Sequence, residues 1–143
     1  MIPTPFTYFF TLRLHDTDAA GRLFFAHLFR HAHDAFENLM TALGVPLDAM
    51  ISAGQTLLPL IHAEADYRQP LCHGDQVQVQ VTIAEIRRRS FAIHYVFLNH
   101  HHQIAATART IHCQINADGS AADDLSPMLR TALTSFQHSA IPL

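Results

Sequence analysis

The sequence predicts an α+β fold in which one antiparallel sheet is covered by one long helix. Over several short stretches, apolar residues recur at every second position between turn-forming residues, which is typical of half-buried strands. Over 23–43 they recur at three- and four-residue steps instead, which is typical of an amphipathic helix. The order of these stretches is strand, long helix and then four further strands.

The first strand is expected over 7–14, where apolar and polar side chains alternate. Its inward residues are predicted to be Tyr8, Phe10, Leu12 and Leu14. The long helix over 23–43 is expected to end at Gly44, because glycine readily takes the left-handed conformation of a C-terminal cap. A short helical turn is predicted over 47–53, between a proline and a glycine.

The remaining four strands are predicted to follow one another as in a meander, over 57–67, 76–83, 91–98 and 104–115. A closing helix begins at Ser126-Pro127, a good N-cap and first helical residue. No repeat or linker interrupts the chain, so residues 1–143 are expected to form one domain. One helix covers only one face of the sheet. We therefore expect a homodimer or homotetramer to cover the rest.

The composition excludes several classes of protein. Hydrophobic residues make up 49% of the chain and charged residues 15%, which indicates a globular protein. A net charge of −3 argues against nucleic acid as a partner. Polar residues break every apolar stretch before a membrane-spanning length, and no secretion signal is recognisable at the start. Two cysteines fit a reducing cytoplasm, which is the expected location.

The junction between the first strand and the long helix carries the motif Asp16-Thr17-Asp18-Ala19-Ala20-Gly21. A carboxylate beside the unpaired N–H groups of a helix start has the parts of an acyl-transfer site, namely a nucleophile or base next to oxyanion donors. Gly21 would let a ligand approach the backbone closely. The alternative is that one aspartate caps the helix and the other is solvated, and spacing alone favours that alternative.

Three segments resemble one known family. DTDAAGRLFFAHL is similar to the opening motif of the hotdog-fold acyl-CoA thioesterases of the 4-hydroxybenzoyl-CoA thioesterase family. ADYRQPLCHGDQVQVQVTI and AEIRRRSFAIHYVF resemble later strands of that family, in the same order. The resemblance covers most of residues 7–116. It implies a helix wrapped by an antiparallel sheet, two protomers that form one continuous sheet, and active sites at their interface.

The resemblance also implies roles for individual residues. Asp18 matches the family's catalytic carboxylate, which either attacks the thioester or activates water, and Asp16 is expected to hold the loop or cap the helix. His33, within HAHDAFE, resembles the histidine of 1,4-dihydroxy-2-naphthoyl-CoA thioesterases, where an imidazole would meet an aryl hydroxyl. The alternative is a histidine buried at a subunit interface. Arg22 and His27 depart from the family's usual aliphatic residue and asparagine.

Arg87, Arg88 and Arg89 gather a third of the chain's nine basic residues into one turn. Guanidinium groups bind phosphate in bidentate fashion, and the family uses this connection for the nucleotide end of coenzyme A. The alternative is a solvated hairpin.

Two further groups of residues are expected to play no part in the chemistry. His100-His101-His102 is predicted to be an exposed turn, because no partner shows metal-ligand spacing, so no metal is expected. A cysteine nucleophile is not expected either, since Cys113 is predicted to lie in the core and Cys72 to lie in a loop without a base.

The leading hypothesis is an enzyme that hydrolyses an aromatic acyl-CoA thioester, with 1,4-dihydroxy-2-naphthoyl-CoA of phylloquinone and menaquinone synthesis as the first candidate. No cofactor is expected, because coenzyme A is part of the substrate. One alternative is a thioesterase of broad specificity for short and medium acyl chains. Another, of a different class, is a non-catalytic module that binds acyl-CoA or an acyl carrier.

Overall fold

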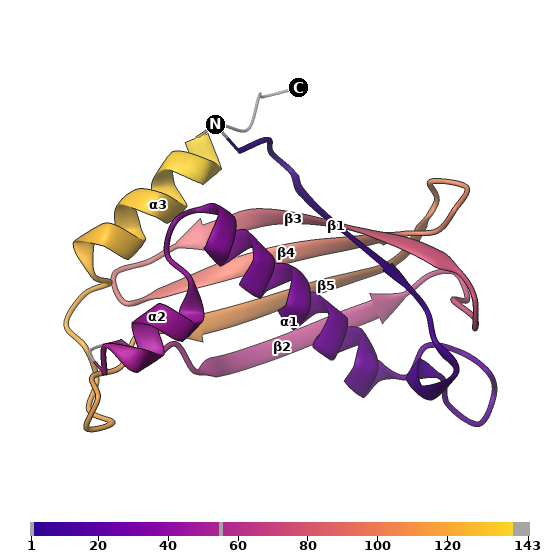
Figure 1. Ribbon diagram of the computed structural model, residues 1–143, viewed down its shortest axis with the longest axis horizontal. Helices are drawn as coiled ribbons and strands as arrows, with labels where there is room; N and C mark the ends of the chain where they lie inside the picture. The colour runs from indigo at the N-terminus through magenta and orange to yellow at the C-terminus, as the bar shows by residue number, and fades with distance from the viewer. Residues whose placement is uncertain (1, 55, 139–143) are drawn as a thin grey trace.

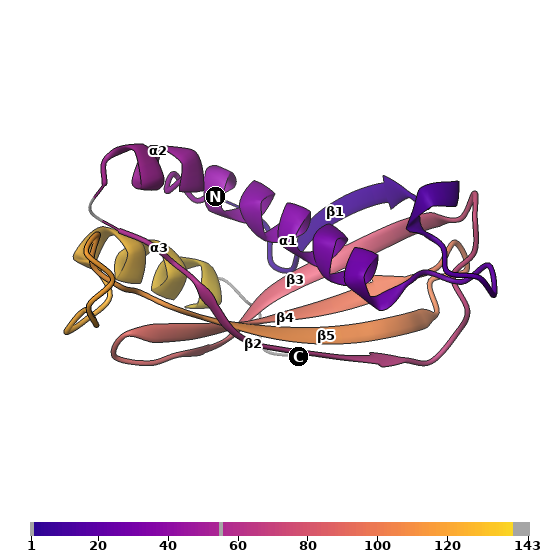
Figure 2. The same cartoon turned by 90° about the horizontal axis from the view of Figure 1, so that it is seen from below.

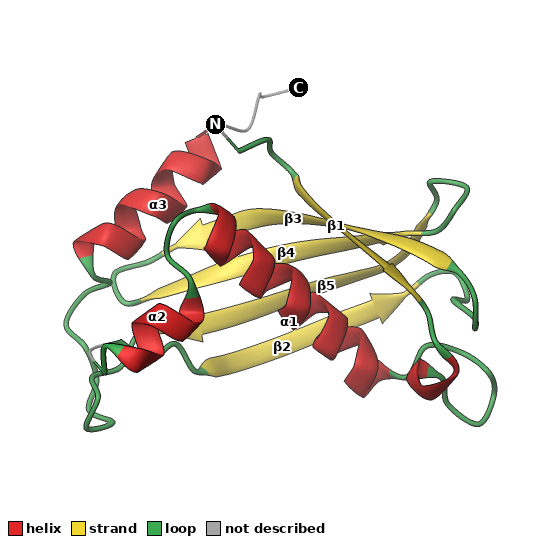
Figure 3. Cartoon of the chain, in the orientation of Figure 1, coloured by secondary structure: helices red, strands yellow, loops and turns green. Residues whose placement is uncertain are grey.

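The computed structural model describes residues 2–54 and 56–138, so both ends of the predicted domain 1–143 lie outside the described residues. Figure 3 shows the predicted mixture of strands and helices. In chain order the elements are β1 (Phe6–Thr11), the 3-10 helix η1 (Leu14–Asp16), α1 (Phe25–Ala42), α2 (Leu47–Ser52), β2 (Leu60–Tyr67), β3 (Gln76–Ile86), β4 (Ser90–Leu98), β5 (Ile104–Cys113) and α3 (Pro127–His138).

The strands form one antiparallel sheet in the order β1-β3-β4-β5-β2. The predicted meander is therefore correct for β3, β4 and β5 but wrong for β2, which lies at the far edge against β5. The reason is that β3 has no free edge. Its register with β1 pairs Phe6 with Val81, and its other edge pairs Val81 with Tyr95 of β4.

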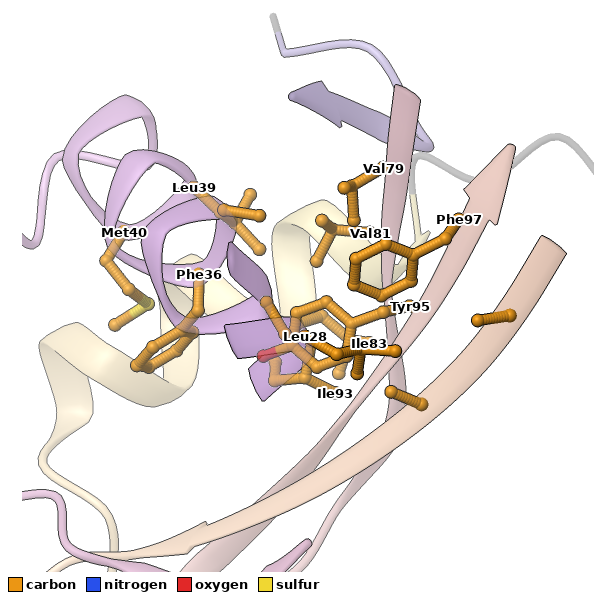
Figure 4. Close-up of a cluster of buried hydrophobic side chains, with 14 of the residues drawn as sticks. Leu28, Phe36, Leu39, Met40, Val79, Val81, Ile83, Ile93, Tyr95 and Phe97 are labelled. Atoms are coloured by element: carbon orange, nitrogen blue, oxygen red, sulfur yellow. The ribbon is translucent and has the colours of Figure 1, made fainter. Parts of the chain in front are cut away.

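Helix α1 lies diagonally across one face of the sheet (Figures 1 and 2). Its apolar face is fully buried and packs against inward side chains of β3 and β4 (Figure 4). The members of this core include Leu28, Phe36, Leu39 and Met40 of α1 and Val79, Val81, Ile93, Tyr95 and Phe97 of the sheet. The periodicity of the sequence thus predicted the helix and the face that it buries.

The predicted C-terminal cap of α1 is confirmed. Gly44 has a φ of 81°, and its N–H donates to the carbonyl of Thr41 at 3.1 Å. The N–H of Val45 donates to the carbonyl of Met40 at 3.0 Å, which completes a Schellman motif. Glycine is favoured here because a side chain would be strained at this dihedral angle.

The first strand is shorter than predicted. It ends at Thr11, and Leu14 belongs to η1 with 68% of its surface exposed. Leu12 continues the inward pattern and is buried, but the chain then turns because Leu12 closes a two-bond link with the 74–75 turn. The alternating pattern of the sequence continues past the end of the strand, so the prediction that Leu14 points inward is wrong.

The inward face of β5 is polar near its end, which corrects the prediction for Cys113. Thr110, His112 and Gln114 are buried, whereas Cys113 on the opposite face is only half-buried. Two of these three inward side chains, Thr110 and Gln114, are tolerated because they find partners. Thr110 shares a hydrogen bond of 3.1 Å with the Tyr95 hydroxyl, and Gln114 accepts from the Ser126 N–H at 2.7 Å.

Two surfaces of the protomer are open. In the described part of the chain, no helix lies on the face of the sheet opposite α1 (Figure 2). At its edge, β2 pairs with β5 and with no other strand of the described residues, and it exposes side chains on both faces, including Leu60, Ile61 and Tyr67. No helix in the described ranges is long and apolar enough to span a membrane.

Candidate active site

Asp18 lies in a tight turn over residues 17–22, between η1 and α1. Its Oδ1 accepts hydrogen bonds from the backbone N–H of Ala20 at 2.9 Å and of Arg22 at 3.1 Å. The side chain is exposed, and Oδ2 has no hydrogen-bond partner in the part of the chain that the structure describes. One oxygen therefore fixes the orientation of the carboxylate, and the other remains available to a substrate.

Gly21 shapes this turn through its backbone. Its φ is 78°, in the left-handed region, and its N–H donates to the carbonyl of Asp18 at 3.0 Å. A Cβ built at this position would meet no atom within 4 Å. The glycine is therefore favoured by its dihedral angle and not by close packing.

The prediction that Asp18 stands at the start of the helix is wrong. Helix α1 begins at Phe25, and its N-cap Phe24 has no side-chain hydrogen bond. The amides that hold Asp18 belong to its own turn. The backbone amides next to the Asp18 carboxylate therefore belong to a short hydrogen-bonded loop and not to the helix terminus.

Asp16 is fully buried and ties the loop to α1. Its Oδ2 accepts from the Arg13 N–H at 2.9 Å, and its Oδ1 accepts from the Arg30 guanidinium at 2.5 Å and lies 3.2 Å from His31 Nε2. Burial would raise the pKa of the Asp16 carboxyl, but these three partners outweigh burial and hold the pKa below its usual value. The Phe24 N–H donates to the Asp16 carbonyl at 3.0 Å, which fixes the approach to the helix.

His31 was not predicted to take part in this cluster. Its ring stacks on Phe10 of β1 with centroids 3.7 Å apart and planes 7° apart. Burial lowers the pKa of His31, although the hydrogen bond and charge of Asp16 oppose that shift. The sequence held no signal for the contact, because it arises only when η1 folds back onto α1 and β1.

A surface pocket of about 310 Å³ opens beside Asp18, between its turn and the end of β2. Its polar lining residues include Arg22, Tyr67 and Arg68. The Tyr67 hydroxyl donates to the Leu23 carbonyl at 2.8 Å. Burial raises the pKa of this hydroxyl, and the charge of Asp18 raises it further. The pocket can thus present a thioester to the Asp18 carboxylate, whose Oδ2 forms no ion pair with the described residues.

His33 is not part of this pocket in one protomer. It lies roughly 12 Å along α1 from Phe25 and is half-exposed, with Nε2 3.2 Å from Glu37 Oε1. Its ring faces Phe36 and the buried His112 of β5, with centroids 5.7 and 6.4 Å away.

The arginine hairpin lies at the opposite end of the sheet from the Asp18 turn (Figure 1). β3, which spans this separation, has 11 residues and is therefore roughly 35 Å long. Arg87 forms an ion pair with Glu85 at 2.8 Å, whereas Arg88 and Arg89 are exposed and make no ion pair within the described residues. Arg130 of α3 donates to the carbonyls of Arg87 and Arg88 and so holds the hairpin backbone.

The histidine run after β4 forms a surface turn. His100, His101 and His102 are exposed, and His102 has a φ of 60°. The rings of His100 and His101 lie 3.9 Å apart. Across residues 2–54 and 56–138, no group of three or more His, Cys, Asp or Glu side chains is arranged to hold a metal ion.

An antiparallel sheet curved around one long helix defines the hotdog fold, here with an acidic turn at one end of the sheet. The sequence profile of the thioesterase-like superfamily matches residues 12–133. The chain therefore belongs to this superfamily, and the predicted hotdog fold is confirmed.

Proteins similar to this chain carry a consistent description. A 1,4-dihydroxy-2-naphthoyl-CoA hydrolase of Synechococcus elongatus is 41% identical over 102 residues, which are 71% of this chain and 74% of the relative. The enzyme of the same name from Rippkaea orientalis is 33% identical over 131 residues, 90% and 95% of the two chains. A crystal structure of a 1,4-dihydroxy-2-naphthoyl-CoA thioesterase from Synechocystis matches with a TM-score of 0.84 and 30% identity, and covers 92% of this chain and 97% of the other.

Proposed function

We propose that this protein hydrolyses 1,4-dihydroxy-2-naphthoyl-CoA to the free acid and coenzyme A. The observation that carries the proposal is the Asp18 carboxylate, which lines a pocket and is held by two amides through one oxygen, while the other oxygen has no hydrogen-bond partner among the described residues. The names of the similar proteins support the reaction and the acyl group. No cofactor is required, and two free cysteines agree with a cytoplasmic location.

Asp18 has two chemical routes to the same products. As a nucleophile, Oδ2 would attack the thioester carbon and expel the thiolate, and water would then cleave the mixed anhydride. As a base, Oδ2 would take a proton from the water that attacks the same carbon. In both routes the thioester C–S bond breaks and the coenzyme A sulfur receives a proton.

We propose further that the active unit is a homodimer in which two β2 strands pair edge to edge, alone or as half of a tetramer. The free edge of β2 and its exposed apolar side chains Leu60 and Ile61 support this arrangement. An antiparallel pair of β2 strands has a two-fold axis between them. That axis brings the Asp18 turn of the partner towards the middle of α1 and towards the end of the sheet where the arginine hairpin lies.

The composite site predicts intersubunit complementation. One chain would carry Asp18→Asn, and the other would carry Arg88→Ala with Arg89→Ala. If each site takes Asp18 from one subunit and the hairpin from the other, the heterodimer holds one intact site. We expect co-expressed, doubly tagged heterodimers to show about half the wild-type kcat with a wild-type KM. A heterodimer KM raised to that of the Arg88→Ala, Arg89→Ala homodimer would place Asp18 and the hairpin of each site on the same subunit and would reject the composite site.

The hairpin is expected to act on substrate binding. Exposed guanidinium groups would bind the phosphates of coenzyme A equally in the ground and transition states, so Arg88→Ala with Arg89→Ala should raise KM about tenfold and leave kcat within twofold. Arg109→Ala provides the control, because Arg109 is ion-paired to Glu85 away from the hairpin tip. An unchanged KM would remove the phosphates from this turn.

A panel of thioesters tests the reaction and the acyl group together. We expect the highest kcat/KM for 1,4-dihydroxy-2-naphthoyl-CoA, a lower value for benzoyl-CoA and the lowest for hexanoyl-CoA, measured as released thiol. A preference for hexanoyl-CoA would support the broad-specificity alternative. Absence of thiol release from every ester would support a binding module and overturn the proposed hydrolase.

A further inference from the structure

All nine basic residues of the chain are arginines, and they divide by whether the guanidinium is already occupied. Four bind carboxylates or backbone carbonyls; these are Arg30, Arg87, Arg109 and Arg130. The other five make no ion pair in the described part of the chain; these are Arg13, Arg22, Arg68, Arg88 and Arg89. Two of these five belong to the hairpin, and two others, Arg22 and Arg68, line the pocket of Asp18.

Arg22 is fixed next to Asp18 by its backbone. Its N–H donates to Asp18 Oδ1 at 3.1 Å, and its carbonyl accepts from the Asp18 N–H at 2.8 Å. An antiparallel bridge to Cys72 holds the same residue from the other side. The guanidinium reaches Cys72 Sγ with Nη1 at 3.3 Å, and its other N–H groups have no partner among the described residues.

Arg68 approaches the pocket from the end of β2. Its N–H donates to the Ala105 carbonyl at 2.8 Å, as does the N–H of Gln69 at 3.0 Å, so the backbone is anchored. No described residue forms a hydrogen bond or ion pair with the Arg68 guanidinium, including Asp18 in the same pocket. Two arginines and one aspartate therefore line this pocket, so its charged lining residues carry a net positive charge.

We propose that Arg22 and Arg68 form an anion-binding subsite that takes an acyl-group oxygen, such as an aryl hydroxyl or its phenolate. The inference rests on the proposed function and adds a determinant of its specificity. A guanidinium presents several N–H donors to an oxygen, and it favours the ionised form of that oxygen. Because Asp18 lines this pocket, a thioester carbon within its reach can place the acyl group there, with the phosphates of coenzyme A at the far end of the pantetheine arm.

The test compares four esters that distinguish an oxygen of the acyl group from the phosphate oxygens of coenzyme A. These are 1-hydroxy-2-naphthoyl and 2-naphthoyl thioesters, each of coenzyme A and of pantetheine. We expect Arg22→Leu and Arg68→Leu each to lower kcat/KM about tenfold or more for both hydroxylated esters and less than threefold for both others. Arg22→Lys should retain part of the selectivity. Arg13→Leu removes an unpaired arginine outside the pocket. It should leave the ratio of kcat/KM for the hydroxylated ester to that for the unhydroxylated ester unchanged, both with coenzyme A and with pantetheine.

Each other outcome overturns the subsite. A loss confined to the coenzyme A esters would assign the arginines to phosphate, and an equal loss on all four would assign them to the geometry of the Asp18 turn. Binding of free 1-hydroxy-2-naphthoate and 2-naphthoate, measured by calorimetry, decides the matter even if no ester is hydrolysed. A preference of the wild type for the hydroxylated acid that Arg22→Leu abolishes supports the subsite; equal affinities refute it. Hydrolysis without hydroxyl selectivity would refute the subsite but leave the proposed function standing.

Discussion

Replacing Asp18 by Asn is expected to reduce kcat for thioester hydrolysis by about 10³-fold, with the fold intact. The amide oxygen of Asn can still accept the hydrogen bonds of Ala20 and Arg22, so the turn over 17–22 should persist. The amide nitrogen that takes the place of Oδ2 is neither a nucleophile nor a base. The loss should therefore fall on the chemical step and leave the affinity for coenzyme A esters nearly unchanged. Released thiol under saturating substrate measures it.

Asp48→Asn is the matched control for this substitution. Asp48 is an exposed carboxylate in the first turn of α2, away from the Asp18 turn. Its change should leave kcat within twofold, and both variants should melt within a few degrees of the wild type. If Asp18→Asn retained a tenth of the wild-type kcat, Asp18 would be neither nucleophile nor base, and the proposed mechanism would fail.

Features set by neighbouring residues could be predicted from the sequence. The three- and four-residue steps of α1 marked its buried face, and Gly44 marked its end, because helix periodicity and a left-handed cap depend on residues one or two turns apart. The position of Asp18 in an acidic turn followed from a resemblance of motifs and not from spacing. The backbone amides beside Asp18 were wrongly predicted to belong to the helix, since a short loop and a helix start both offer free amides in this stretch of the chain.

Features set by distant residues could not be predicted. The place of β2 depends on which edges β1 and β4 leave free, and this is known only when the sheet is assembled. The cluster of Asp16 with Arg30 and His31 joins η1 to α1 and has no periodic signature. The prediction that Cys113 faces the core was wrong because Thr110 and Gln114, on the opposite face, are polar residues that face inward. The partners that satisfy them come from other elements.

His112 on β5 is the buried histidine with the strongest departure from ordinary titration. Its ring packs against Phe36 and Phe91, with centroids 4.4 and 5.6 Å away, and the two phenylalanine centroids lie 6.1 Å from each other, so the three rings form one cluster. Nδ1 lies 3.3 Å from the Leu58 carbonyl and donates to it in the neutral ring, whereas Nε2 is buried without a partner among the described residues. Burial lowers the pKa of His112 to about 4, because a proton on Nε2 would place a charge where nothing accepts its hydrogen bond.

Stability should therefore fall as the solution is acidified from pH 6.5 towards pH 4. The folded pKa of His112 lies below the unfolded value of 6.5, so the unfolded chain takes up a proton first and gains free energy from it. The contribution is complete above pH 6.5 and is lost progressively down to the folded pKa. Between pH 6.5 and pH 5 the loss of unfolding free energy amounts to about 2 kcal/mol.

His112→Phe should remove this part of the pH dependence, because phenylalanine can pack against Phe36 and Phe91 but cannot bind a proton. Urea unfolding of both proteins at pH 7, 6 and 5 measures the effect, and this range stays above the titration of ordinary carboxyl groups. The difference in unfolding free energy between variant and wild type should shift in favour of the variant by about 2 kcal/mol from pH 7 to pH 5. His94→Gln, on the opposite face of the sheet, should leave that difference constant. Parallel pH profiles for His112→Phe and the wild type would mean that His112 is already hydrated or protonated in the fold, and the dry cluster of His112 with Phe36 and Phe91 would then not exist in solution.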